Sequence, residues 1–381
     1  MDRLTLVAPC LFGLERLIKE ELTDLGCEVL GAQDGRVRFA GTLETVVMTN
    51  LWLRCAERVQ LELAQFEAPT FDALFEGVKA VDWPAFATAD SAIVVTGSSV
   101  RSALSSLPAC QRIVKKAIVD KLGAAHGLTR LPETGPALQV QFFLLKDRAS
   151  ILLDTSGAPL HKRGYRLESG LAPLRETLAA ALVRLCRYRG GQAFADPLCG
   201  SGTLAIEAAM RATRTAPGLR RAFLFEQYGF LPKGLLVQAR ERARAELRPA
   251  EADILACDID PAMRTLTLQN ARRAGVDHCM TVAEAPLSAF APAAARGTLI
   301  CNPPYGERMS ELRACEALYR EMGQVFDRLP GWDYGILTSH EEFERHFGRP
   351  ADKKRKLYNG MIRCDFYQYY KHVRQAQAPR P

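Results

Sequence analysis

Three short clusters of polar and small residues in this 381-residue sequence have the types and spacing for chemistry. The first reads Asp-Pro-Leu-Cys-Gly-Ser-Gly-Thr, from Asp196 to Thr203. Its two glycines allow the backbone to approach a ligand closely. Thr203 opens a predicted helix, whose N-terminus favours a negative ligand group. The cluster lacks the Gly-Lys-Ser/Thr of a phosphate-binding P-loop. It predicts a ligand-binding turn, with a purely structural turn as the alternative.

The second cluster, Asp258-Ile259-Asp260-Pro261, directly follows Cys257. A carboxylate at the end of a strand can accept hydrogen bonds from both hydroxyls of a ribose. Asp260 before Pro261 also fits the N-cap and first position of a helix. We therefore predict that Asp260 caps a helix and that Asp258 binds a ligand.

The third cluster, Asn302-Pro303-Pro304-Tyr305, follows an apolar run. The Pro-Pro pair stiffens the loop and removes two donors, so the Asn302 side-chain oxygen and the Pro303 carbonyl can both face outward. Two such acceptors suit an exocyclic amino group, because accepting its protons frees the nitrogen lone pair. The Tyr305 ring can stack on an extruded base. A plain turn is the alternative.

Alternating strands and helices must position these clusters. After residue 174 the predicted strands are 193–195, 254–257, 298–301, 334–338 and 362–370, and the predicted helices are 174–188, 203–211, 262–274 and 311–329. This alternation predicts an α/β domain with a parallel, doubly wound sheet. Ligands of such sheets bind outside the carboxyl ends of the strands, which is where all three clusters fall.

The first 165 residues predict two smaller α+β units. Their predicted strands are 4–8, 37–40, 92–96, 138–145 and 150–154, and their predicted helices are 13–22, 43–53, 71–81 and 109–122. The join Lys146-Asp147-Arg148 has the length of a hairpin turn.

Charge is unevenly distributed along the chain. The formal net charge is +7, but residues 1–100 carry 8 basic and 15 acidic side chains, whereas residues 101–166 carry 11 and 4. Residues 211–248 hold 9 basic and 3 acidic side chains, and residues 345–374 hold 9 and 2. This asymmetry indicates a surface for a polyanion. A solvated charged face is the alternative for any single cluster.

Composition excludes several classes of protein. With 48% hydrophobic and 24% charged residues, the composition is typical of a globular protein. No apolar run is long enough to predict a membrane span. The N-terminus predicts no secretory signal, so we expect a cytoplasmic protein. The 11 cysteines and 6 histidines show no metal-ligand spacing. We expect reduced thiols and no metal site.

The three clusters and their order resemble class I methyltransferases that use S-adenosylmethionine (SAM) to methylate exocyclic amino groups of bases. The segments 160–166, 172–178 and 356–360 also resemble family elements. Together they resemble the THUMP-domain methyltransferases of large-subunit ribosomal RNA, which act on the 2-amino group of guanine. The resemblance implies a class I (Rossmann-like) methyltransferase sheet at 161–381, preceded by a ferredoxin-like domain at 1–65 and a THUMP RNA-binding domain at 66–160.

The resemblance also assigns residues to the site. The residues it implies for SAM are Thr177, Asp196, Pro197, Cys199, Gly200, Ser201, Gly202, Thr203, Asp258 and Ile259. Those implied for the target base are Asn302, Pro303, Pro304 and Tyr305. Within these sets, Asp258 would hold the ribose and Ile259 would pack on the adenine. One departure is that Pro286 stands where the family has an acidic residue near the adenine amino group, with Glu284 close by.

The implied reaction is in-line transfer of the SAM methyl group to a base nitrogen. It needs no side-chain nucleophile, so Cys199 and Cys301 are expected to serve packing. The expected partner is rRNA or pre-ribosomal RNA, and the enzyme is expected to be a monomer. The candidate RNA-binding residues are Arg101, Arg112, Lys115, Lys116, Lys162, Arg163 and Arg166.

Other functions remain open on the sequence alone. The Asn-Pro-Pro-Tyr motif also serves adenine-N6 methylation of DNA or RNA. A protein that binds RNA during ribosome assembly without catalysis would retain the N-terminal half. A nicotinamide oxidoreductase is disfavoured because Gly-Ser-Gly lacks the third glycine of the dinucleotide fingerprint.

Overall fold

A computed structural model describes residues 3–166, 174–306 and 309–370. The chain forms two compact units. The first contains residues 1–10, 18–160 and 222–242, and the second contains residues 11–17, 161–221 and 243–381. Neither unit is a continuous stretch of the sequence, because residues 222–242 from the middle of the chain belong to the first unit.

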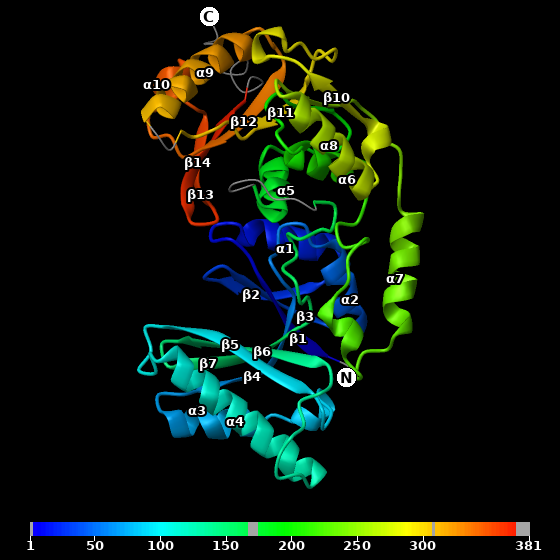
Figure 1. Ribbon diagram of the computed structural model, residues 1–381, viewed down its shortest axis with the longest axis vertical. Helices are drawn as coiled ribbons and strands as arrows, with labels where there is room; N and C mark the ends of the chain where they lie inside the picture. Colours follow the sequence, from blue (N-terminus) through cyan, green and yellow to red (C-terminus); the bar gives the residue numbers. More distant parts are fainter. Residues whose placement is uncertain (1–2, 167–173, 307–308, 371–381) are drawn as a thin grey trace, which may run out of the picture. The chain divides into compact units, whose positions relative to one another are not determined.

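The first unit is built on a seven-stranded sheet with the order β2-β3-β1-β4-β7-β6-β5 (Figure 1). Its strands are β1 (Leu4–Pro9), β2 (Glu28–Gln33), β3 (Arg36–Gly41), β4 (Gln60–Glu67), β5 (Ala92–Val100), β6 (Ala137–Leu145) and β7 (Arg148–Asp154). All described pairings are antiparallel except that of β5 with β6. Since β4 pairs with both β1 and β7, one sheet joins the two predicted N-terminal units.

The helices that lie wholly or mostly in the first unit are α1 (Glu15–Asp24), α2 (Leu43–Trp52), α3 (Phe71–Lys79), η1 (Trp83–Ala85), α4 (Leu107–His126), η2 (Leu224–Gln227) and α7 (Gly234–Ala245). Pro108 stands in the first turn of α4, where no amide is needed, and Gly127 ends it with φ +67°. Val114, Ala117 and Ile118 are buried along α4, so its apolar face lies against the sheet.

A tight turn joins β6 and β7. Lys146 and Asp147 both adopt positive φ, at 50° and 61°. Two positive φ values in succession give the turn whose twist matches antiparallel strands. This confirms the hairpin predicted from the sequence.

The second unit is built on another seven-stranded sheet, with the order β10-β9-β8-β11-β12-β14-β13. Its strands are β8 (Ala193–Asp196), β9 (Ile254–Asp258), β10 (Met280–Glu284), β11 (Gly297–Cys301), β12 (Trp332–Thr338), β13 (Lys353–Asn359) and β14 (Ile362–Tyr369). The strands β10, β9, β8, β11 and β12 are parallel, and β14 runs antiparallel to β12 and β13. The predicted doubly wound, Rossmann-like class is confirmed.

The helices of this unit are α5 (Glu176–Leu185), α6 (Thr203–Ala212), α8 (Pro261–Ala274), η3 (Asp277–Cys279), η4 (Leu287–Ala289), α9 (Met309–Asp327) and α10 (Phe343–Phe347). One face of the sheet packs against α9 and α10 through Tyr319, Phe326, Tyr334 and Phe343. In the described part of the chain, no helix is long and apolar enough to span a membrane.

Candidate active site at the strand ends

The glycine loop between β8 and α6 is held by bonds from its neighbours. The Cys199 amide donates to the Cys257 carbonyl at 2.8 Å. From α8, Thr267 Oγ1 donates to the Gly200 carbonyl at 2.8 Å. Gly202 has φ +82°, and a Cβ there would come within 2.6 Å of Thr267. The sequence therefore needs glycine at 202 for both conformation and space.

Asp258 at the end of β9 ties two loops together. Its Oδ2 accepts from the Gly200 amide at 2.8 Å, and its Oδ1 accepts from the Asp260 amide at 3.0 Å. Each carboxylate oxygen can accept a second hydrogen bond, so the group can still bind a ligand hydroxyl. Asp260 Oδ1 accepts from the Ala262 amide at 2.8 Å, which confirms its predicted role as the N-cap of α8.

Two further residues lie at this edge of the sheet. Ile259 is 69% exposed, which is unusual for a large apolar side chain. Glu284 ends β10 opposite Asp258 in the parallel register and is exposed. An apolar surface and a carboxylate therefore flank Asp258, as binding of an adenosine would require.

Asp196 at the end of β8 is 1% exposed. Its Oδ1 accepts from the Leu198 amide at 3.2 Å. Burial raises the pKa of Asp196 well above its usual value, the Leu198 amide lowers it, and Asp258 raises it further. Pro197 is also buried, so the start of this cluster shapes the loop from beneath.

The cysteines of the site are thiols. Burial raises the pKa of Cys199 and of Cys301, and the nearby Asp196 carboxyl raises both further. Burial raises the pKa of Cys257 to about 11. Since a thiolate is the nucleophilic form, these values support packing roles for Cys199 and Cys301.

Arg166 lies beside the N-terminus of α6. Its guanidinium donates to Thr203 Oγ1 and to the Leu174 carbonyl, the latter at 3.2 Å, and pairs with Glu176 at 3.6 Å. Glu176 and Thr177 begin α5 and are both buried. This part of α5 thus borders the glycine loop through Arg166.

The Asn302 loop follows β11, the neighbour of β8. The Tyr305 hydroxyl donates to Asn302 Oδ1 at 2.5 Å. Pro303 is buried and Pro304 is exposed, and the Pro304 carbonyl accepts from the Tyr319 hydroxyl of α9 at 2.8 Å. Burial is the largest cause that raises the pKa of Tyr305, so this hydroxyl stays protonated and remains a donor.

Two predicted RNA contacts fail on burial. Arg163 is 3% exposed, and its Nε lies 3.3 Å from Glu207 Oε1 in a buried ion pair. The Arg166 side chain is 9% exposed and bonded within its own unit. Neither guanidinium faces a phosphate-accessible surface here. The sequence shows that both residues are charged. It does not show that Arg163 pairs with Glu207, which lies 44 positions further along the chain.

The other candidate RNA contacts lie nearer solvent. Arg101, Arg112, Lys116 and Lys162 are exposed, and Lys115 is half-buried. Lys115 pairs with Glu133 at 2.8 Å, and Lys116 lies 5.7 Å from the centre of the Phe75 ring. These positions remain available to a polyanion. Residues 172 and 173 of the segment 172–178 lie outside the described residues.

A groove on the first unit's sheet was not predicted. It has a volume of about 490 Å³ and is lined from β3, β4, β6 and β7 by residues that include Arg36, Glu62, Phe143 and Arg148. The Arg36 guanidinium lies 3.4 Å from the centre of the Phe143 ring, although β3 and β6 are separated by three strands. The sheet must curl for this contact to form. Burial lowers the pKa of Arg36 to about 10, and Asp34 partly offsets it.

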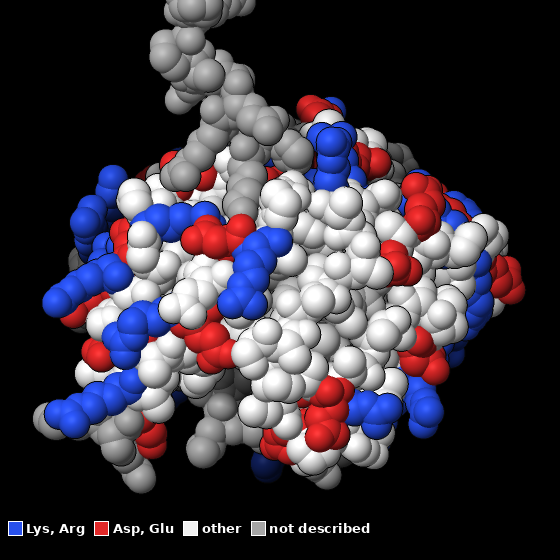
Figure 2. Space-filling model, turned by 90° about the horizontal axis from the view of Figure 1, so that it is seen from above, with Lys and Arg blue, Asp and Glu red and all other residues white. Residues whose placement is uncertain are grey.

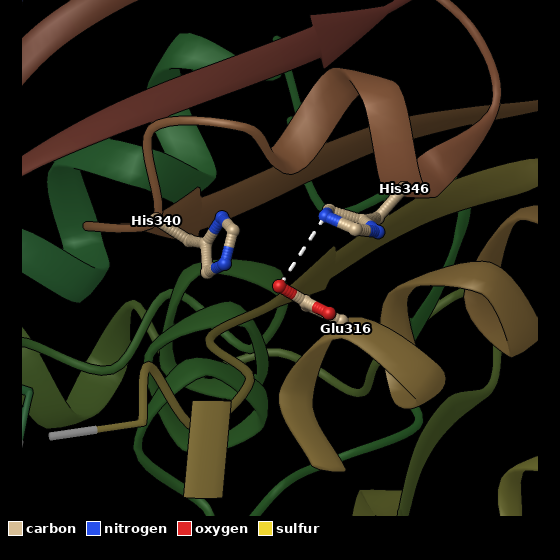
Figure 3. Close-up of side chains that lie close together, drawn as sticks. All are labelled: Glu316, His340 and His346. Atoms are coloured by element: carbon tan, nitrogen blue, oxygen red, sulfur yellow. Dashed lines mark ion pairs between the residues drawn. The ribbon is translucent and has the colours of Figure 1, made fainter. Parts of the chain in front are cut away.

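Glu316, His340 and His346 converge in the second unit (Figure 3). Their ligand atoms lie within 4.8 Å of one another, although the sequence predicted no metal-ligand spacing. His346 Nδ1 lies 3.1 Å from Arg320 Nη1, which can only donate. The lone pair therefore sits on Nδ1, and Nε2–H faces Glu316 at 3.6 Å. In this tautomer His346 is neutral, and its Nε2–H points toward the Glu316 carboxylate without forming a hydrogen bond.

The surface over α9 and α10 has mixed charge. Figure 2 shows Lys and Arg side chains interspersed with Asp and Glu on the left of the view. Arg345, for example, pairs with Glu342 at 3.3 Å. This surface is therefore not a continuous basic face.

Comparison with family models divides the chain into three matched segments. Residues 163–368 match the RMKL-like methyltransferase domain, residues 5–60 match the RlmL ferredoxin-like domain, and residues 68–154 match the THUMP domain. The structure places the three strand-end clusters within the first of these segments.

Two curated relatives are similar in sequence. "Putative RNA methyltransferase YpsC" of Bacillus subtilis is 44% identical over 377 residues, covering 98% of both chains. "Ribosomal RNA large subunit methyltransferase K/L" of Methylococcus capsulatus is 38% identical over 93% of this chain but only 50% of that protein. The chain thus spans the whole of one relative and half of the other.

Two solved structures are similar over nearly the whole chain. "SMU.472, a putative methyltransferase complexed with SAH" has a TM-score of 0.90 and 40% identity, covering 97% of this chain and 98% of that one. A "predicted N6-adenine-specific DNA methylase" from Listeria monocytogenes has a TM-score of 0.92 and 41% identity, covering 97% of each. The first holds the demethylated product of SAM.

Proposed function

Since the chain belongs to the RMKL-like methyltransferase family, we propose that it transfers the SAM methyl group to the 2-amino group of a guanine in large-subunit rRNA. The observation that carries this proposal is the Asn302 loop, which follows the strand next to the glycine loop. An acceptor for an exocyclic amino group would thereby lie beside the edge that we assign to the cofactor.

SAM is the cofactor of this family, and the residues at the strand ends fit it. We assign the ribose hydroxyls to Asp258, the adenine face to Ile259, and the amino-acid end to the loop from Gly200 to Gly202 near Thr177. We also assign the adenine amino group to Glu284, which lies level with Asp258 on β10, in the role that Pro286 cannot perform. When bound, SAM supplies an electrophilic methyl group.

The chain's own contribution is orientation and polarisation. Asn302 Oδ1 and the Pro303 carbonyl would accept the two protons of the target amino group, which leaves the nitrogen lone pair directed at the methyl group. In the free protein the Tyr305 hydroxyl donates to the same Asn302 oxygen. It holds the amide in place until the target amino group replaces it, after which the Tyr305 ring is free to stack on the base.

The RNA assignment is supported by the relatives' names and the THUMP match. We propose three domains, at 1–65, 66–160 and 161–381, with the first two serving RNA binding. Folded RNA would be bound by its shape and phosphates, with the target base extruded. We further propose a monomer in the cytoplasm.

Adenine-N6 methylation is the second candidate, because the Listeria structure carries that name and the Asn302 loop suits either amino group. A third, of a different class, is an RNA-binding assembly factor without catalysis. The retained glycine loop and Asn302 favour an active enzyme over this last alternative.

The test is mass spectrometry of rRNA nucleosides from cells with and without the gene. We expect loss of one N2-methylguanosine from the large-subunit rRNA, restored when purified protein and SAM are added. Loss of N6-methyladenosine instead would move the activity to the second candidate. SAM binding without transfer to any nucleoside would favour the third.

A further inference from the structure

The β13–β14 hairpin projects beyond the sheet at the edge that carries the site. Thr338, the last residue of β12, pairs with Asp365 of β14. The antiparallel strand β14 begins three residues earlier, and its partners in β13 run to Asn359. The hairpin tip therefore extends past the carboxyl ends of the parallel strands, where the three clusters lie.

The two faces of the tip differ in exposure. Leu357, Asn359 and Cys364 are buried on one face. On the other, Lys356, Tyr358 and Arg363 are exposed, with Tyr358 paired across the strands with Arg363. Tyr358 is 41% exposed, and Met361 in the turn is 97% exposed.

The buried face of the tip contacts the catalytic loop. The Tyr305 hydroxyl lies close to the side chains of Asn359 and Cys364, both of which influence its pKa. The same hydroxyl donates to Asn302. The hairpin tip and the target-binding loop are therefore one connected structure.

Protection of an exposed sheet edge explains only part of this composition. Lysines on an edge strand discourage pairing with other chains, and β13 is the edge strand of its sheet. Protection of the edge does not explain why the exposed Tyr358 and Met361 lie beside these lysines. In the described residues, no ion pair engages Lys356 or Arg363, so both charges are available.

We propose that the β13–β14 tip is a second RNA-binding element, which grips the nucleotide next to the extruded target base. Tyr358 would stack on the neighbouring base, Lys356 and Arg363 would bind its phosphates, and Met361 would fill the gap left in the base stack. Aromatic stacking and cationic contacts of this kind are how proteins bind unpaired RNA. The inference rests on the proposed RNA substrate.

The experiment measures methylation of large-subunit rRNA from cells lacking the gene, together with filter binding of the same RNA over a range of salt. Tyr358→Ala should weaken RNA affinity about 5- to 100-fold and raise KM for RNA, with kcat and SAH affinity unchanged. Tyr358→Phe should restore binding, because the ring still stacks. The pair Lys356→Gln and Arg363→Gln should reduce the salt slope by about 1.4, at about 0.7 for each phosphate contact on a single strand.

Arg328→Gln is the matched control, because Arg328 is exposed just before β12 begins, at the opposite edge of the sheet. If the Tyr358 and basic-residue variants behave like this control while wild-type protein methylates the RNA, the hairpin inference is overturned alone. If wild-type protein neither binds nor methylates the RNA, the proposed function and the hairpin inference are both contradicted.

Discussion

The two sheets of this protein have the same number of strands but use them differently. In the second unit, five parallel strands bring Asp196, Asp258, Glu284 and Asn302 to one edge. In the first unit, the mostly antiparallel sheet curls instead, and its polar side chains line a groove on a face. Parallel pairing gathers loops from distant parts of the sequence at one edge, whereas antiparallel pairing alternates the strand ends.

The two arrangements suit different functions. Loops at a parallel edge can combine a nucleoside site with an acceptor loop in a small volume. A curled face presents a broad surface of Arg36, Phe143 and Arg148 that no single loop defines. Changes at the edge should therefore affect chemistry, and changes at the face should affect stability or broad binding.

The largest expected effect is at the edge. Asn302→Ala should lower kcat by about 100- to 1,000-fold, by analogy with the loss of one transition-state contact. SAM affinity, measured by calorimetry, should stay near that of the wild type. Asn302→Asp, which keeps the acceptor oxygen, should retain more activity than the alanine variant. Wild-type turnover of Asn302→Ala would remove the loop from the mechanism.

A smaller effect is expected for cofactor binding at the same edge. Asp258→Ala should weaken SAM affinity about 10- to 100-fold, because a charged acceptor is lost. Asp260→Ala is the control, since Asp260 only caps α8. It should cost about 1 kcal/mol of stability and leave SAM affinity unchanged. Equal SAM affinity in both variants would move the ribose contact elsewhere.

The face of the first sheet should respond in stability instead. Arg36→Ala removes the half-buried contact with Phe143 and should lower the free energy of unfolding by about 1–2 kcal/mol. Arg148 lines the same groove but is exposed, so Arg148→Ala should lower the free energy of unfolding by less than about 0.5 kcal/mol. Chemical denaturation measures both. A change in SAM affinity in either variant would contradict the separation of roles between edge and face.

The smallest effect concerns pH and Asp196. Because burial raises its pKa in the folded state, protonated Asp196 is favoured by folding. Its stabilising contribution is complete below the unfolded pKa of about 3.9 and is lost as pH rises through the folded pKa. Asp196→Asn should therefore melt a few degrees above the wild type at pH 8, with a smaller difference at pH 5. Calorimetric scans at the two pH values measure this, and a constant difference would contradict it.

The sequence was sufficient for features that depend on local order. Strand β11 was predictable because the apolar run from Leu299 to Cys301 directly precedes Asn302, and the cap of α8 because Asp260 precedes Pro261. The groups that follow parallel strands could be placed together from topology alone. Local pattern thus predicted the class of the second unit and the composition of its edge.

Features that depend on distant partners were missed. Strand β4 was not predicted, because it crosses the expected boundary at residue 65 and is defined by pairing with β1 and β7. Strand β13 reads as a charge cluster until β14 pairs with it. Strands β2 and β10 and helices α7 and α10 were also missed. In each case tertiary contacts outweigh local propensity.

The segment 222–242 has a consequence for synthesis of the chain. In the first unit, the Tyr228 hydroxyl donates to the Asp154 carbonyl at 2.6 Å, and the Phe225 amide donates to the Thr155 carbonyl at 3.0 Å. Because a ribosome releases residues in order, the N-terminal unit cannot complete its packing until residue 242 has emerged. By then β8 and α6 of the second unit have already left the ribosome. The first unit can therefore complete its packing only after part of the second unit has been synthesised.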